Sequence, residues 1–129
     1  MSFDEFFNVT FEFRDCELIK QDKGNVVIKT IVNKTNVNPY GKAHGGYLYT
    51  LCDSLAGLVG YTLGHYYVTL QANINYMKAV NLNDELYLEG KCIHEGGTTA
   101  VIEIEIKNND ASVTKGQFTL FKIGEVEIQ

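Results

Sequence analysis

The chain has 129 residues, of which 45% are hydrophobic and 21% are charged, so its length and composition predict one folded domain over residues 1–129. Its formal net charge of -5, without a run of basic residues, argues against nucleic acid as a partner, because such binding needs clustered Lys and Arg. The three cysteines lie far apart with no C-x-x-C pair, which is typical of free thiols in a reducing compartment and not of a disulfide framework or zinc site.

The first fifteen residues mix five phenylalanines with acidic residues, and they predict a short helix or an extended arm packed on the domain. This segment lacks the basic region and long apolar stretch of a signal peptide. The longest weakly polar stretch of the chain is interrupted by Asp53, several glycines and a histidine, so it does not predict a membrane span. We therefore expect a cytoplasmic protein with no membrane partner.

Two strands are expected between residues 16 and 32, joined by a turn at 21–24. Residues 33–46 hold the only proline and three glycines, and they predict a loop. Leucines at three-to-four spacing then predict a helix over 47–63. Gly57 and Gly60 are poor helix formers, so we expect another surface to approach the helix closely there.

The rest of the chain predicts an antiparallel meander of about four strands, because β-branched and aromatic residues dominate four runs. These runs are 67–77, 85–94, 98–106 and 112–123. Together with the first two strands they give an α+β domain with one sheet and one main helix. A single helix covers only one face of such a sheet, and the chain has no second long helix for the other face. We therefore expect a second copy of the chain to cover that face, in a dimer or tetramer.

Asp53 is the only Asp, Glu, Lys or Arg between residues 43 and 77. At 100° per residue it lies away from the leucine stripe, on the helix side that we expect to face away from the sheet. A carboxylate there can act as a general base or nucleophile, or it can be held by backbone groups in a subunit interface. The residue pattern leaves both interpretations open.

His44, Gly45 and Gly46 directly precede the predicted helix. A helix N-terminus exposes unsatisfied N–H groups, and glycine lets a substrate approach them without a Cβ in the way. An N–H of Gly45 or Gly46 could therefore hold a carbonyl oxygen, although a plain glycine turn would give the same pattern. For His44 we favour a hydrogen-bonding role in the loop over acid/base work.

The segment 38–46 (NPYGKAHGG), with His44 six residues after Asn38 and Asp53 nine after His44, resembles a known signature. With the string NINYMKA at 73–79, it is similar to the hotdog-fold thioesterases of the PaaI-like and thioesterase superfamily member 2-like family. The resemblance covers residues 15–123. It implies a hotdog fold, in which one long central helix is wrapped by a single antiparallel sheet of about five or six strands.

The same resemblance implies an acyl-CoA thioesterase, which hydrolyses an acyl-CoA to a free acid and coenzyme A. Asn38 would orient the thioester or the attacking water, and the Gly45 N–H would polarise the carbonyl. Asp53, from the partner subunit, would act as general base or nucleophile. Thr69 would help position water, unless it is only a β-branched strand residue. His44 and Gly46 would support substrate binding.

Coenzyme A is part of the substrate in this interpretation, so no cofactor is expected, and three scattered histidines predict no metal site. Lys78 and Lys91 could contact its phosphates, or they could be ordinary surface lysines. Two other functions stay open. A hotdog acyl-thioester hydratase or dehydratase would use His44 and Asp53 for proton transfer at carbon, and a non-catalytic acyl-CoA binding module would not need Asp53.

Overall fold

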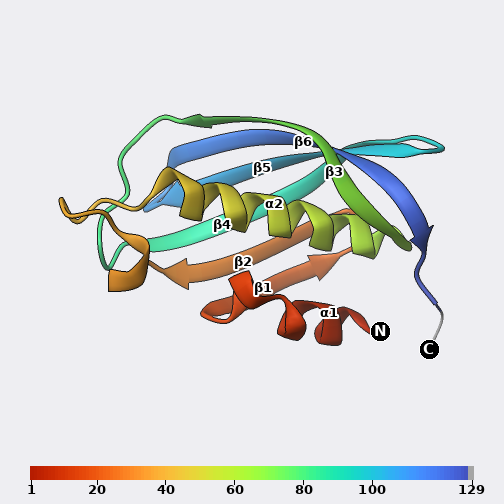
Figure 1. Cartoon of the computed structure of the whole chain (residues 1–129), viewed down its shortest axis with the longest axis horizontal. Coiled ribbons are helices and arrows are strands. Elements are labelled where there is room, and N and C mark those ends of the chain that lie inside the picture. The colour runs from red at the N-terminus through yellow and green to blue at the C-terminus, as the bar shows by residue number, and fades with distance from the viewer. Residues whose placement is uncertain (128–129) are drawn as a thin grey trace.

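Six antiparallel strands form one sheet that curves around a long helix in the computed structural model, which describes residues 1–127 (Figure 1). The helices are α1 (Phe3–Val9) and α2 (Gly45–Thr62), with short 3-10 turns η1 (Phe11–Phe13) and η2 (Lys34–Asn36). The strands are β1 (Cys16–Asp22), β2 (Asn25–Ile31), β3 (His65–Tyr76), β4 (Glu85–Glu95), β5 (Thr99–Asn108) and β6 (Ala111–Glu125). The predicted α+β architecture is therefore confirmed.

The strand order in the sheet is β1-β2-β4-β5-β6-β3. Strands β4, β5 and β6 form the expected meander, but β3 pairs with β6 alone and makes the far edge of the sheet. The prediction that all four later strands form one meander is wrong for β3. Strand β4 pairs with β2 instead, which leaves β1 and β2 on one flank of helix α2 and β3 on its other flank (Figure 1).

The core lies between α2 and the concave face of the sheet. The leucine stripe of the helix is buried, as its spacing predicted, and so are alternate residues of the central strands. Fully buried strand residues include Ile28, Leu86, Leu88, Ile102, Ile104, Ile106 and Phe118. Within residues 1–127, no helix has the length and apolar character that crossing a membrane requires.

The N-terminal segment is a short helix packed on the domain, one of the two forms expected from its sequence. Ser2 caps α1 by accepting a hydrogen bond of 3.1 Å from the Glu5 backbone N–H. The Phe6 ring lies 4.9 Å from the ring of Tyr61 on α2, and Phe13 in η1 is buried. These contacts join α1 and η1 to α2.

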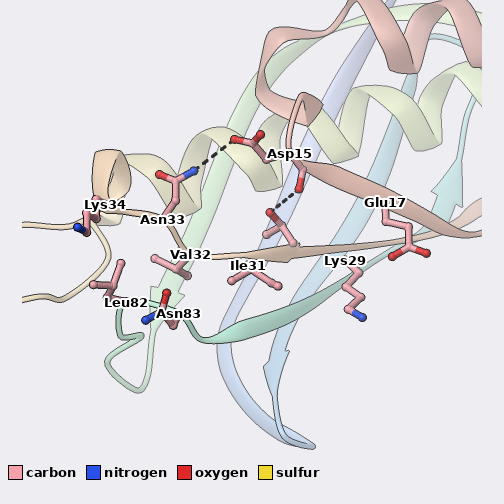
Figure 2. Close-up of a pocket in the computed structure, with 10 residues that line it drawn as sticks. Asp15, Glu17, Lys29, Ile31, Val32, Asn33, Lys34, Leu82 and Asn83 are labelled. Carbon is pink, nitrogen blue, oxygen red and sulfur yellow. Dashed lines mark hydrogen bonds between the residues drawn. The ribbon is translucent and has the colours of Figure 1, made fainter.

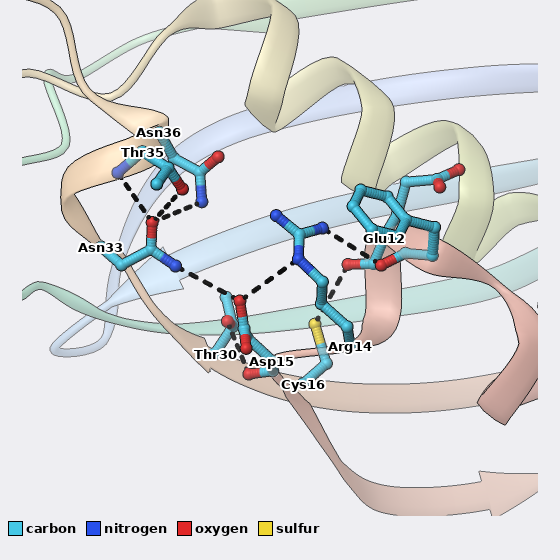
Figure 3. A network of polar contacts seen from close by, with 9 residues as sticks. Glu12, Arg14, Asp15, Cys16, Thr30, Asn33, Thr35 and Asn36 are labelled. Carbon is cyan, nitrogen blue, oxygen red and sulfur yellow. Dashed lines mark hydrogen bonds and ion pairs between the residues drawn. The ribbon is translucent and has the colours of Figure 1, made fainter.

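A polar network anchors the loop that leads into α2 (Figure 3). The Thr30 hydroxyl donates to the Asp15 carbonyl at 3.0 Å, and the Asn33 amide donates to the Asp15 carboxylate at 3.3 Å. Asn33 Oδ1 in turn accepts from the Thr35 backbone N–H at 3.0 Å and from the Asn36 amide at 3.1 Å. The network therefore holds η2 against the start of β1 and the end of β2.

The two interior glycines of α2 differ in what surrounds them. A Cβ at Gly60 would lie 2.6 Å from the Tyr67 ring and 3.3 Å from Leu120, whereas a Cβ at Gly57 would meet nothing within 4 Å. The expected close approach therefore occurs at Gly60, where β3 crosses the helix, and not at Gly57.

This difference predicts opposite effects on stability. Gly60→Ala should lower the free energy of unfolding by about 1–2 kcal/mol, because the methyl group overpacks the contact with Tyr67. Gly57→Ala should raise it by about 0.5–1 kcal/mol, because alanine favours helix more than glycine does. Urea denaturation of both variants checks this, and equal effects of the same sign would contradict it.

Candidate active site

Helix α2 begins at Gly45 with its first N–H groups open. His44 is the N-cap residue; its backbone N–H donates to the Asn36 carbonyl at 3.0 Å, and its side chain caps no N–H of the helix. Within residues 1–127, no acceptor binds the backbone N–H of Gly45 or Gly46. These groups carry the partial positive charge of the helix N-terminus, so they can receive a carbonyl oxygen or an oxyanion.

A groove of about 380 Å³ lies directly beside Gly45. Its lining is Lys42, Ala43, Gly45, Leu48, Tyr76, Met77, Lys78, Ala79 and Val80. The predicted support residue Lys78 thus lies at the same groove as Gly45. Lys91 does not line it: this residue lies on the outer face of β4, 3.7 Å from Glu89.

Tyr76, at the end of β3, is a groove residue that the sequence did not single out. Its hydroxyl donates to the Gly45 carbonyl at 2.8 Å, and its ring lies 3.4 Å from where a Cβ of Gly45 would stand. The string at 73–79 marked this strand as similar to a family, but nothing in the sequence showed that its tyrosine would reach the start of α2.

Asn38 shapes the loop before the helix. Its Oδ1 accepts hydrogen bonds from the backbone N–H groups of Tyr40, at 2.9 Å, and Lys42, at 3.1 Å. This Asx-type turn fixes which side-chain atom is the oxygen, since only the oxygen can accept from two N–H groups. The amide NH₂ of Asn38 has no acceptor among residues 1–127, so it is the part of the side chain that can meet a substrate or water.

Asp53 and Thr69 lie together in the structure. The Thr69 hydroxyl donates to Asp53 Oδ1 at 2.5 Å, and Thr69 faces the helix because it is opposite the buried Leu120 of β6. The prediction that Asp53 faces away from the sheet is wrong. The sheet curves so far around α2 that β3 and β6 cover this flank too, with Tyr49 of the helix 5.7 Å from Phe118 of β6.

Cys52, next to Asp53, does not supply a nucleophile. Its side chain is fully buried, and this burial raises the pKa of the thiol to about 12. The thiol therefore stays protonated near neutral pH, whereas the attacking form of cysteine is the thiolate. Asp53 therefore stays the candidate acid/base residue of this part of the helix.

One chain holds the predicted residues in two separate groups. Gly45 and Lys78 line the groove at the start of α2, with Gly46 next in the helix and Asn38 in the loop before it, whereas Asp53 and Thr69 lie about two turns further on. Gly45 and Asp53 are thus roughly 12 Å apart along the helix axis. Among residues 1–127, no cluster of His, Cys, Asp or Glu could hold a metal ion.

A cleft larger than this groove lies away from both groups. It has a volume of about 480 Å³ and lies along β1, β2 and the loop after β3, with residues such as Asp15, Lys29, Lys34 and Asn83 around it (Figure 2). Its side chains carry both signs of charge, and none of the predicted site residues lines it. Size alone therefore does not locate the candidate site.

Several known proteins similar to this chain are named as thioesterases. The family model described as "Thioesterase superfamily" matches residues 40–115. A hypothetical thioesterase protein from Streptococcus pneumoniae, solved with coenzyme A, is 43% identical with a TM-score of 0.91, covering 98% of this chain and 100% of that one. A Streptococcus mutans protein bound to acetyl CoA is 40% identical, with a TM-score of 0.86 and coverage of 89% and 94%. The acyl-coenzyme A thioesterase PaaI of Escherichia coli is 27% identical over 71% of this chain and 66% of its own length.

Two other structures of the Streptococcus pneumoniae protein carry single alanine substitutions, one of an aspartate and one of a threonine. Both are 46% identical to this chain with a TM-score of 0.85, over 88% of this chain, and over 94% and 93% of theirs. The two substituted positions are 16 residues apart, the same interval as between Asp53 and Thr69. The likeness to these structures and to that of PaaI, at a TM-score of 0.82, confirms the hotdog fold that the sequence predicted.

Proposed function

This chain belongs to the thioesterase superfamily, and from that premise we propose that it hydrolyses an acyl-CoA thioester to a free carboxylic acid and coenzyme A. The observation that carries this proposal is the open N–H of Gly45, which lines the groove, together with the open N–H of the next residue, Gly46. Such donors stabilise the oxyanion that forms when a thioester carbonyl is attacked. The coenzyme A found with the Streptococcus pneumoniae protein supports the choice of thioester.

The proposed reaction uses two groups of residues. The Gly45 N–H polarises the thioester carbonyl, and the Asn38 amide orients the thioester or the water. Asp53 takes a proton from water as the water oxygen attacks the carbonyl carbon, or it attacks that carbon itself and forms a mixed anhydride, which water then hydrolyses to release the acid and restore Asp53; the same carboxylate serves both routes. The carbon–sulfur bond then breaks, and coenzyme A leaves as its thiol once a proton reaches the sulfur. Thr69 holds the carboxylate through the 2.5 Å hydrogen bond.

We further propose that each site is shared between two chains. Within one chain Gly45 and Asp53 are separated by roughly 12 Å along the helix, which is too far for both to reach one carbonyl. The partner's copy of Asp53 and Thr69 would complete the site. Asn38, Gly45, Gly46 and Lys78 would thus come from one chain, and the acid/base pair from the other.

Strand β3 offers the surface for this pairing. It binds β6 along one edge and leaves the backbone groups of its other edge unpaired within residues 1–127. Large apolar side chains on and just after it are exposed, with Leu70 at 64%, Val68 at 49% and Met77 at 49%. An open, apolar edge of this kind favours association with a second copy, as a dimer that could assemble further into a tetramer.

Charge and thiol chemistry support two further parts of the proposal. Lys42 and Lys78 line the groove and supply positive charge for the phosphates of coenzyme A. Coenzyme A enters as part of the substrate, and the proposed reaction needs no other cofactor.

The cysteines at 16, 52 and 92 are all free thiols, which fits a cytoplasmic location.

Incubation of the protein with saturated, hydroxy- and aryl-acyl-CoAs tests the proposed function. We expect release of free thiol from at least one of these classes, with no change in enoyl absorbance. A hydratase or dehydratase would change the enoyl absorbance without releasing thiol, and a binding module would bind acyl-CoA and do neither. Either of these outcomes would contradict the proposal.

A further inference from the structure

Tyr76 links the end of β3 to the first residue of α2. It is opposite Thr114 of β6, on the side of the sheet that faces the helix, and it lines the groove. Its hydroxyl donates to the Gly45 carbonyl at 2.8 Å. The carbonyl oxygen has two lone pairs, so it can accept this hydrogen bond as well as the one from the next helical turn.

The hydrogen bond acts on the peptide group that joins Gly45 to Gly46. The Gly45 carbonyl and the Gly46 N–H belong to the same planar amide, so a donor at the oxygen polarises the N–H at the other end. The Gly46 N–H has no acceptor among residues 1–127, and a Cβ at Gly46 would meet nothing within 4 Å. This N–H is therefore free to meet a ligand.

We infer that Tyr76 is a positioning residue for the carbonyl site: it fixes the Gly45–Gly46 peptide and strengthens the Gly46 N–H as a second donor to the thioester oxygen. The inference rests on the proposed function and adds a residue and a donor to it. The gain is largest in the transition state, when the oxygen carries most negative charge. On this inference, Tyr76 has no contact with the reacting atoms, and its effect passes through this peptide.

Tyr76→Phe tests the inference because it removes only the hydroxyl. We expect kcat for thiol release to fall about tenfold while KM changes less than about twofold, as for an interaction that strengthens in the transition state. Tyr87→Phe is the matched control, since Tyr87 lies exposed on β4 and lines no part of the groove. It should leave both constants unchanged.

A second measurement does not depend on turnover. Labelling with ¹⁵N-glycine gives signals from 12 glycines, and the Gly46 signal is the one that Gly46→Ala removes. Loss of the Tyr76 hydroxyl should move the Gly46 amide proton upfield, because its peptide group becomes less polarised. The same signal should stay in place in Tyr87→Phe.

The two measurements separate a positioning role from a purely structural one. If the hydroxyl only ties β3 to α2, Tyr76→Phe lowers the melting temperature but leaves kcat and the Gly46 signal unchanged, and the inference is overturned. If the wild-type protein hydrolyses no acyl-CoA, the proposed function fails. The Gly46 signal then decides alone: an upfield shift supports the polarised peptide, and an unchanged signal overturns it.

Discussion

Asp53→Asn is expected to lower kcat for acyl-CoA hydrolysis by about a thousandfold, which is in the range for loss of a general base or nucleophile. The asparagine Oδ1 can still accept the hydrogen bond from the Thr69 hydroxyl, so the local geometry should survive. What the variant loses is the ability to take a proton from water or to attack the carbonyl. Steady-state thiol release, with melting temperature and oligomer size measured on the same samples, checks this expectation.

Asp22→Asn is the matched control for the Asp53 variant. Asp22 is an exposed carboxylate at the end of β1, and its ion pair with Lys20, at 3.6 Å, is also exposed. Its loss should leave kcat unchanged. Activity of Asp53→Asn within tenfold of the wild type, in a folded protein, would show that Asp53 does not carry the chemistry.

Mixing two inactive variants should restore activity if the site is shared. Asn38→Asp keeps the Oδ1 that holds the loop and removes the amide NH₂, so this variant should fold and yet be impaired. When Asn38→Asp and Asp53→Asn chains are co-expressed, half of the randomly formed dimers are mixed, and each mixed dimer has one intact site. About a quarter of the wild-type activity should return.

This experiment has two controls. One is each variant expressed alone, and the other is co-expression of two differently tagged copies of Asp53→Asn. Neither should show recovery. If the mixture of the two variants stays as inactive as its parts, while mixed dimers are detected by their tags, the proposal that Asn38 and Asp53 meet across two chains is wrong.

The sequence predicted most of the fold because its signals are local. The leucine spacing of α2 and the alternation of apolar and polar residues at 101–106 each show which side chains share a face. The leucine face of the helix and the isoleucine face of the strand are both buried, as expected. The position of β3 was not predictable in this way. Strand pairing depends on contacts between distant segments, and the periodicity of a helix does not show that one sheet will cover two of its flanks. For the same reason Asp53 was expected on the wrong side.

The candidate site shows the same division. The family signature supplied Asn38, Gly45 and Asp53 as candidate residues. In the structure, Asn38 lies in the loop before α2, Gly45 begins this helix, and Asp53 lies about two turns into it. The role of Tyr76 depends on a hydrogen bond between residues 31 positions apart in the chain, so no local pattern could reveal it. Its signal was an aromatic residue in a strand, and strands often contain such residues for packing alone.

Strand β3 carries the open edge, Thr69 and Tyr76, so on the shared-site proposal the enzyme's activity depends on its own abundance. By mass action, dilution below the dissociation constant of the dimer would silence every site while each chain keeps its fold. The cell could then set the rate of thioester hydrolysis through the expression level, more steeply than in proportion to it. Substitutions along β3 would also be constrained twice, once by assembly and once by chemistry.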